Sequence, residues 1–408
     1  MNIKTIAPAA LTSLVAFGAA DSALAQRAQV VSPGSPAGTT LGQSTRFDSD
    51  FNPAVSLATD LVADWYGYDG DSEDGFDLGL RRVDFLVADW IDPNAFSWIT
   101  VAYEEEEFGI EEGAIEYVGL PGNWSMRGGR FFVDFGKQMQ AHIEQLRTVD
   151  RPLVLREYLG EELPGDGAQI DNWFGVGDYT LVRFSVGVFG DLAGESHGED
   201  DEVGPELSPA ERAVFGDLGY TGRLTGLTEI GENGTLQFGG SARFLSNFAF
   251  EVDGSEAGAQ ELDNAVYGLD LTYGWLSDTG TRSFTVGGEY LMFDGDIGAD
   301  FDDNGTPGDG TDDTLTVLDD SVTGAYGFVD YGWSQFSSAG VQYSFAEEPD
   351  ASKADLSELD LYYTRRLSDF LRLRFATTFG EVEGGEDYTR FAVQLTGFIG
   401  PHGHGLNW

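Results

Sequence analysis

The sequence predicts an all-β protein: a transmembrane antiparallel β-barrel of about 16 strands with an inward constriction loop. Segments of roughly ten residues repeatedly alternate apolar and polar side chains, which is the period of a β-strand. The connections between these segments alternate between short turns and long acidic stretches. After the N-terminal region, no segment has the roughly 18 consecutive apolar residues of a membrane-spanning helix.

Composition excludes several classes of function. The net charge of −48 would repel a phosphate backbone, so no nucleic-acid partner is expected. The absence of cysteine excludes disulfides, thiol nucleophiles and cysteine-ligated metal sites. No nucleophile elbow, Walker loop or His-Glu-x-x-His motif is present, so no catalytic residue is predicted and the chain is not expected to be an enzyme.

The N-terminus has the layout of an export signal. Lys4 precedes an uncharged apolar stretch from Ile6 to Ala20, and Ala23-Leu24-Ala25 supplies a small-x-small cleavage site. We therefore expect a signal peptide over residues 1–25, a flexible segment over 26–50 and a barrel over 51–408.

Each expected strand has one apolar and one polar face. Val182, Phe184 and Val186, for example, alternate with Arg183 and Ser185. A soluble β-sandwich shows the same period, but strands of about 9–13 residues exceed the usual 5–6 and match the length of a tilted strand that crosses a bilayer. In lipid every backbone polar group must be paired, so such strands have to close into a barrel.

Connection lengths predict the strand count and the orientation. The turns at 277–280 and 367–369 are short, whereas 191–212, 251–264 and 294–321 are expected to be long acidic outer loops. Short periplasmic turns opposite long outer loops are typical of bacterial outer-membrane barrels. At roughly 22–24 residues per strand and connection, the chain holds about 16 strands, a size that encloses an aqueous channel.

Motifs in the middle and at the end of the chain resemble a known family. They read GRFFVDFGKQMQAH over 129–142, VDRPLVLREYLGEE over 149–162, GDGAQIDNWF over 165–174 and FAVQLTGFIGPHGHGLNW over 391–408. Their order resembles the phosphate-selective porin (O and P) family of Gram-negative outer membranes. The resemblance implies an outer-membrane porin, a passive channel for small hydrophilic solutes such as phosphate and other anions. It also implies a homotrimer, which would lie among membrane lipid and lipopolysaccharide.

Cations gather in one segment of this acidic chain. Residues 138–146 are expected to form a short helix, and Pro152 then redirects the chain. The segment could fold into the lumen, narrow the pore and present its cations to anions. Alternatively, its arginines tie the loop to acidic neighbours. The candidates are Lys137, His142, Arg147, Arg151 and Arg156.

A second group of arginines occupies the polar faces of the strands. A row of fixed cations in the lumen would favour anions. The competing interpretation is that these arginines pair with inward Asp and Glu on neighbouring strands. The candidates are Arg183, Arg223, Arg243, Arg372, Arg374 and Arg390.

One acidic stretch carries part of a calcium-binding pattern. Asp300, Asp302 and Asn304 place oxygen atoms at alternate positions, as in the first half of a calcium loop. The twelfth position is Thr311 rather than Glu, so a solvated acidic loop is the competing interpretation. Apart from this Ca²⁺, no cofactor is expected. An exported calcium-dependent surface adhesion or binding protein is the alternative function.

Overall fold

The computed structural model describes residues 53–70, 72, 74–104, 107–192, 206–207, 218–252, 255–302, 314–350 and 352–400. The expected signal peptide over 1–25 and the expected flexible segment over 26–50 lie outside these residues. Within the described part of the chain, no helix is long and apolar enough to cross a membrane.

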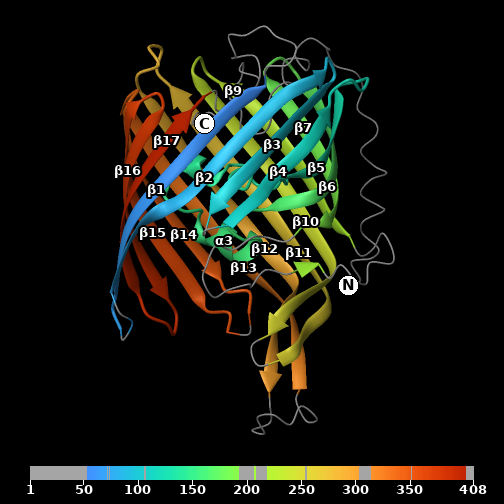
Figure 1. Cartoon of the computed structure of the whole chain (residues 1–408), viewed down its shortest axis with the longest axis vertical. Helices are drawn as coiled ribbons and strands as arrows, with labels where there is room; N and C mark the ends of the chain where they lie inside the picture. The colour runs from blue at the N-terminus through green and yellow to red at the C-terminus, as the bar shows by residue number, and fades with distance from the viewer. Residues whose placement is uncertain are drawn as a thin grey trace.

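Strands account for most of the described chain (Figure 1). They are β1 (Ala54–Tyr68), β2 (Gly75–Asp92), β3 (Ala95–Glu104), β4 (Glu107–Tyr117), β5 (Trp124–Phe132), β6 (Pro164–Val176), β7 (Thr180–Asp191), β8 (Glu206–Leu207), β9 (Gly219–Ile230), β10 (Gly234–Val252), β11 (Ser255–Leu276), β12 (Ser283–Asp302), β13 (Thr314–Ser334), β14 (Ser337–Glu347), β15 (Asp355–Ser368), β16 (Leu371–Val382) and β17 (Tyr388–Ile399).

These strands form a closed antiparallel barrel. The sheet has 17 strands in the described residues, and all except the two-residue β8 form a ring of sixteen. The ring closes because β1 pairs with both β2 and β17. β9 lies between β7 and β10, and the two described residues of β8 pair with Phe248 and Ala249 of β10. The predicted barrel of about 16 strands is therefore confirmed.

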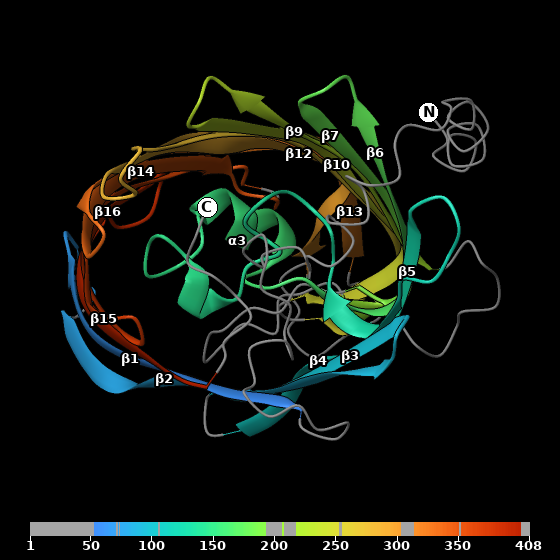
Figure 2. The same cartoon turned by 90° about the horizontal axis from the view of Figure 1, so that it is seen from above.

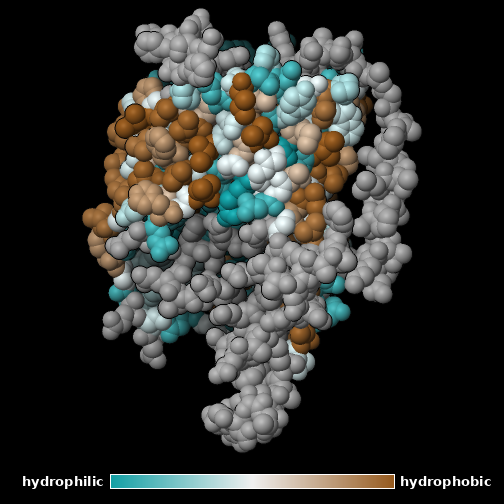
Figure 3. All heavy atoms as spheres, turned by 45° about the vertical axis from the view of Figure 1, so that its right-hand side comes forward, coloured by the Kyte–Doolittle hydropathy of each residue, from teal (hydrophilic) through white to brown (hydrophobic). Residues whose placement is uncertain are grey.

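The two faces of the wall follow the predicted alternation. On β11, Leu269 and Leu271 are exposed on the outer surface, whereas Asp270 and Thr272 are buried inside the barrel. Figure 3 shows apolar residues gathered over the described outer wall. Lipid chains cannot satisfy polar groups, so the apolar face of each strand turns outward and the polar face turns inward.

Two stretches predicted as long outer loops are strands. β10 and β11 remain paired as far as Val252 and Ser255, and β12 and β13 remain paired as far as Asp302 and Thr314. Most of 251–264 and 294–321 therefore forms two hairpins that project beyond the barrel (Figure 1). The prediction was wrong because backbone pairing does not require the apolar face by which the strands were recognised.

The chain between β5 and β6 enters the barrel, as predicted for the constriction loop. Residues 133–163, called the inner loop below, lie inside the ring of strands in Figure 2. The helix expected over 138–146 is not formed: only a 3₁₀ turn, η2 (Ile143–Gln145), lies there, and the α-helix α3 (Leu153–Leu159) follows Pro152. Proline suits a helix start because the first turn needs no N–H from it.

Apolar contacts hold α3 against one side of the lumen. Leu155, Tyr158 and other apolar residues of the inner loop form one buried cluster with inward residues of β7 and β10–β14. The Tyr158 ring lies 5.9 Å from the ring of Phe293, and its hydroxyl donates to Glu347 O at 2.9 Å. The same cluster extends to Leu86 on β2 and Trp98 on β3, where charged residues also contact the inner loop.

Candidate functional site

A β-bulge in β2 turns two neighbouring arginines into the lumen. β1 pairs Asp60 with Arg82 and Leu61 with Leu80, so Arg81 is an extra residue. Adjacent strand residues normally point to opposite faces, but an extra residue at a bulge changes that alternation. Arg81 donates to Asp60 Oδ2 through Nε at 2.9 Å, and Arg82 is also buried inside the barrel.

A second bulge does the same for two glutamates of β4. β3 pairs Thr100 with Glu112 and Val101 with Ile110, so Glu111 is the extra residue. Both glutamates are buried and both contact the inner loop. The two bulges thus place two adjacent basic and two adjacent acidic side chains on the same inner wall.

The glutamate pair holds His142 of the inner loop between them. His142 Nδ1 lies 3.0 Å from Glu111 Oε1, and Nε2 lies 3.3 Å from Glu112 Oε2. The ring of Phe132 meets the imidazole edge-on at 4.6 Å. Carboxylates only accept hydrogen bonds, so contacts at both ring nitrogens require the doubly protonated imidazolium. Burial would lower the pKa of His142, but Glu111, Glu112 and Glu144 together raise it well above its usual value.

This geometry predicts that the inner loop loosens at alkaline pH. A group whose pKa is raised on folding contributes its full stability below the unfolded value, near 6.5, and loses it as pH rises through the folded value. Deprotonated His142 would leave Glu111 with Arg82 as its remaining cation and would remove the cation that contacts Glu112, with Glu144 nearby. We expect wild-type conductance to stay constant through neutral pH and to rise at alkaline pH. In His142→Gln this alkaline step should be absent, and its persistence would assign the transition to another group.

Arg82 is the centre of a buried ionic cluster that joins β2, β3, β4 and the inner loop. Its Nε donates to Asp84 Oδ1 at 2.7 Å, and its Nη1 lies 3.1 Å from both Glu104 Oε2 and Glu162 Oε2. Its Nη2 contacts Glu111. Glu162 belongs to the end of the inner loop, so one guanidinium links that end to the wall.

Arg151 holds the inner loop together from within. Its guanidinium donates to the backbone carbonyls of Gln138, Ala141 and Glu161, the second at 2.5 Å. Loop carbonyls lack the partners that a strand ladder would provide, and a buried arginine can satisfy several at once. The side chain is buried, which suits a structural role.

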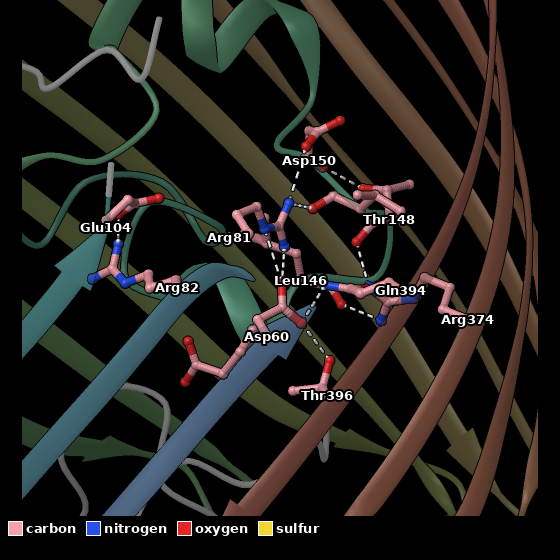
Figure 4. A network of polar contacts seen from close by, with 12 residues as sticks. Asp60, Arg81, Arg82, Glu104, Leu146, Thr148, Asp150, Arg374, Gln394 and Thr396 are labelled. Atoms are coloured by element: carbon pink, nitrogen blue, oxygen red, sulfur yellow. Dashed lines mark hydrogen bonds and ion pairs between the residues drawn. The ribbon is translucent and has the colours of Figure 1, made fainter. Parts of the chain in front are cut away.

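Two arginines of β16, which is separated from β2 by β17 and β1, hold the middle of the inner loop. Arg374 donates to Leu146 O at 2.5 Å and to Thr148 O, and Arg372 donates to Glu144 O. These carbonyls alternate along the loop, as the two arginines alternate along the strand. The wall therefore grips the loop backbone directly (Figure 4).

Arg81 of β2 also holds the inner loop, and its contacts link the loop to the strands that close the barrel. Its Nη1 donates to Val149 O at 2.9 Å and lies 3.2 Å from Asp150 Oδ1. Its partner Asp60 also accepts from Gln394 Nε2 at 2.9 and 3.0 Å. Figure 4 shows how these contacts connect β1, β2 and β17 with the inner loop.

Arg390 of the wall and Arg156 of α3 are also paired with carboxylates. Arg390 donates to Asp64 Oδ1 at 2.6 Å and contacts Asp150. Arg156, which is about a quarter exposed, donates to Glu358 Oε1 at 2.5 Å. Both arginines therefore meet a passing solute with most of their charge already balanced.

The start of the inner loop is held by a further pair of arginines. Asp134 lies 3.0 Å from Arg183 Nη1 and 3.4 Å from Arg223 Nε. Arg183 also contacts Asp171 at 2.6 Å, and Arg223 contacts Asp270 at 2.9 Å. Two carboxylates thus surround each of these guanidinium groups.

Lys137 and Arg147 lie between the inner loop and the β10–β13 wall. Lys137 Nζ donates to Gln237 Oε1 at 2.7 Å, while Arg147 lies 4.0 Å from Asp330 and over the ring of Phe328 at 4.8 Å. Burial, with repulsion from Arg147, lowers the pKa of Lys137 to about 8. Lys137 is therefore only partly charged in mildly alkaline solution.

The basic residues that were predicted from the sequence as pore candidates all lie inside the barrel, and most of them contact a carboxylate or a loop carbonyl. These contacts agree with the interpretation that the arginines tie the inner loop in place. Selection of anions by the same residues stays a prediction.

Sequence reasoning missed Arg81, Glu111 and Glu112 because it assumed an unbroken period of two. A usable signal was present in the charged doublets Arg81-Arg82 and Glu111-Glu112 within strands. A charge on the lipid face costs up to about 2–4 kcal/mol, so a charged doublet in such a strand indicates a bulge.

The predicted calcium site is only partly covered. The backbone of Asp300 and Asp302 lies in β12, and Asn304 lies outside the described residues. Calcium binding there stays a prediction. In the part of the chain that the structure describes, no group of three or more His, Asp or Glu side chains is arranged to hold a metal ion.

Comparison by sequence gives little guidance. No protein-family model matches the chain. An uncharacterized protein of Aquifex aeolicus (strain VF5) is 26% identical over 227 residues, which cover 53% of this chain. The match spans 45% of that relative's own length, so the two proteins are similar over only part of each.

Comparison by structure identifies the fold. An anion-selective porin from Comamonas acidovorans aligns with a TM-score of 0.53 at 10% identity, covering 85% of this chain and 99% of its own. OprB of Pseudomonas putida aligns at 0.51 and 7% identity, covering 85% and 94%. OmpT, an outer membrane protein of Vibrio cholerae, aligns at 0.50 and 10% identity, covering 87% and 100%. The chain thus has the fold of Gram-negative outer-membrane β-barrels, including a porin; the phosphate-selective part of the predicted resemblance stays a prediction.

Proposed function

We propose that this protein is an outer-membrane porin, a passive diffusion channel for small hydrophilic solutes. One observation carries the proposal: a loop enters a closed barrel whose outer wall is apolar and whose inner wall is polar. Closure satisfies the backbone hydrogen bonds in lipid, and about 16 strands leave an interior wide enough for water. The fold shared with solved outer-membrane barrels, among them a porin of Comamonas acidovorans, supports the same conclusion.

The inner loop would set the size limit of the channel. Gly136 donates its N–H to Ser241 Oγ on β10 at 3.0 Å, and Val149 O accepts from Arg81 on β2 at 2.9 Å. β2 and β10 lie on nearly opposite sides of the ring. A loop anchored to both sides crosses the lumen and leaves solutes only the space around it.

We further propose that the acidic mouth gives the channel a weak preference for cations. Most lumen guanidinium groups are compensated by carboxylates or loop carbonyls, as described above. Exposed acids line the end of the barrel from which the inner loop enters, and Lys353 lies among them. They are Asp69, Asp74, Glu107, Asp319, Asp320, Asp355, Glu381, Glu383 and Asp387. A negative mouth concentrates cations at low ionic strength and loses its effect as salt screens it.

Anion preference, phosphate included, is the competing proposal. It draws support from the partly exposed Arg156 and from the similar fold of the anion-selective porin of Comamonas acidovorans. A homotrimer embedded in lipid and lipopolysaccharide is a further part of the proposed function. Its support is that OmpT of Vibrio cholerae has been solved in a trimer form.

The reversal potential of the purified protein in a planar bilayer under a salt gradient tests both parts of the proposal. We expect stable conductance steps with a cation-favouring potential that declines as salt concentration increases. An anion-favouring potential would keep the channel and overturn the charge preference. Correctly folded protein that never conducts would overturn the channel itself.

A further inference from the structure

Arg243 differs from the other arginines of the lumen wall. It is 1% exposed on β10, and no carboxylate of the described residues lies within ion-pair distance of its guanidinium. Among the described residues, its hydrogen-bond partner is Asn264 on β11, whose Oδ1 accepts from Nη2 at 3.2 Å. By contrast, Arg223 on the adjacent strand β9 contacts both Asp134 and Asp270.

Apolar residues flank Arg243 on one side, whereas Thr221, directly opposite on β9, and Ser241, two residues back on β10, are buried neutral polar residues. Leu245, two residues along the same face of β10, and Val266, directly opposite on β11, are both buried members of the apolar cluster beneath the inner loop. An isolated charge removed from water without a partner costs several kcal/mol. The guanidinium therefore requires a source of negative charge.

Within the part of the chain that the structure describes, two hydrogen-bond donors at this position have no acceptor. They are Arg243 Nε and Asn264 Nδ2, both buried. The Nε and Nη2 hydrogens leave the same edge of a guanidinium, so the open Nε donor lies beside the donor that Asn264 Oδ1 already fills. The unfilled Nδ2 belongs to that same amide. Both open donors thus lie where arginine and asparagine meet.

We propose that Arg243 and Asn264 bind a small monovalent inorganic anion, with chloride as the natural occupant. The anion accepts from Arg243 Nε and Asn264 Nδ2 and balances the buried charge. A water molecule could accept the same hydrogen bonds but would leave the charge uncompensated. A divalent oxyanion would need more donors and a second positive charge, and Arg223 is already engaged by two carboxylates.

The ion would be a fixed part of the wall rather than a transported solute. Arg243 is two residues from Ser241, whose Oγ accepts the N–H of Gly136 at the start of the inner loop. An anion at Arg243 therefore stabilises the wall next to one of the anchors of the loop. This inference does not depend on which solutes the channel carries.

Bromide locates the site directly in the wild-type protein. The protein is folded from denaturant and crystallised in sodium bromide, and anomalous scattering is measured. We expect a bromide peak within contact distance of both Arg243 Nε and Asn264 Nδ2. Well-ordered density without an anomalous peak there would identify a water molecule and overturn the proposal.

Thermal unfolding in sodium chloride and in sodium gluconate of equal ionic strength provides a second test. Chloride should raise the wild-type midpoint by about 1.5–2 °C for each tenfold increase above its dissociation constant, whereas gluconate is too large to enter. Asn264→Asp supplies a fixed carboxylate in place of the ion, so its midpoint should be high in both salts. Asn94→Asp, which adds the same charge at an exposed turn, should respond like wild type. Equal wild-type midpoints in both salts, or an undiminished chloride response in Asn264→Asp, would contradict the site.

Discussion

Replacing Arg82 by methionine is expected to destabilise the barrel by about 3–5 kcal/mol and to release the end of the inner loop. The substitution leaves Asp84, Glu104, Glu111 and Glu162 around a buried position with no guanidinium between them. Breaking a buried ion pair by removing one partner is costly because the other charge remains buried. Repulsion should then expel Glu162, the loop member of the cluster, and conductance should rise.

Urea unfolding in lipid vesicles measures the loss of stability, and planar bilayers measure the conductance. Arg282→Met is the matched control, because Arg282 lies in an exposed turn at the opposite end of the barrel from the inner-loop entrance. Its stability should stay within about 0.5 kcal/mol of wild type. If Arg82→Met were equally mild, the four carboxylates would not depend on this guanidinium, and the cluster would not hold the loop.

Replacing Arg374 by methionine should free the middle of the inner loop while leaving the barrel closed. The change removes the hydrogen bonds to Leu146 O and Thr148 O and the bond to Gln394 Oε1 at 2.7 Å. Each buried hydrogen bond from a charged group contributes about 1.5–3 kcal/mol. Docking of this segment should weaken by about 3 kcal/mol, or roughly two orders of magnitude in its equilibrium constant. We expect larger and noisier conductance steps.

Arg366→Met is the control that distinguishes loss of the hydrogen bonds to the inner loop from loss of a positive charge. Arg366 lies near the same end of the lumen on β15, so both variants remove one positive charge from that region. A channel that responds only to charge would change its ion preference equally in both variants and its conductance in neither. Increased conductance in Arg374→Met alone would show that the arginine acts through the inner loop. An unchanged conductance there would mean that the other contacts suffice to hold the loop.

The barrel was predictable because its signal is local and repeated. The alternation at Leu269, Asp270, Leu271 and Thr272 requires only that lipid lies on one side of the strand and water on the other. The same rule failed at Arg81-Arg82 and Glu111-Glu112, where one extra residue in the strand reverses which of the following side chains point into the lumen. It also failed at the two projecting hairpins, where strands remain paired without an apolar face to mark them.

The position of the inner loop was likewise indicated by the cation-rich segment with Pro152, but its contacts were not. A basic segment in an acidic chain favours either solute binding or internal ion pairing, and composition cannot distinguish the two. The distinction depends on which loop carbonyls contact Arg372 and Arg374. Those carbonyls belong to residues that are more than two hundred positions away from the two arginines along the chain.

Fold class, approximate strand number and many of the charged lumen residues therefore follow from a periodicity that is repeated along the chain. The partners of those charges follow from strand register, from two bulges and from the path of the inner loop. These features bring together residues that are distant in sequence. In the sequence, these arginines form an apparently uncompensated row of cations on the polar faces of the strands. In the structure, most of them contact loop carbonyls or carboxylates of neighbouring strands and hold the inner loop in place.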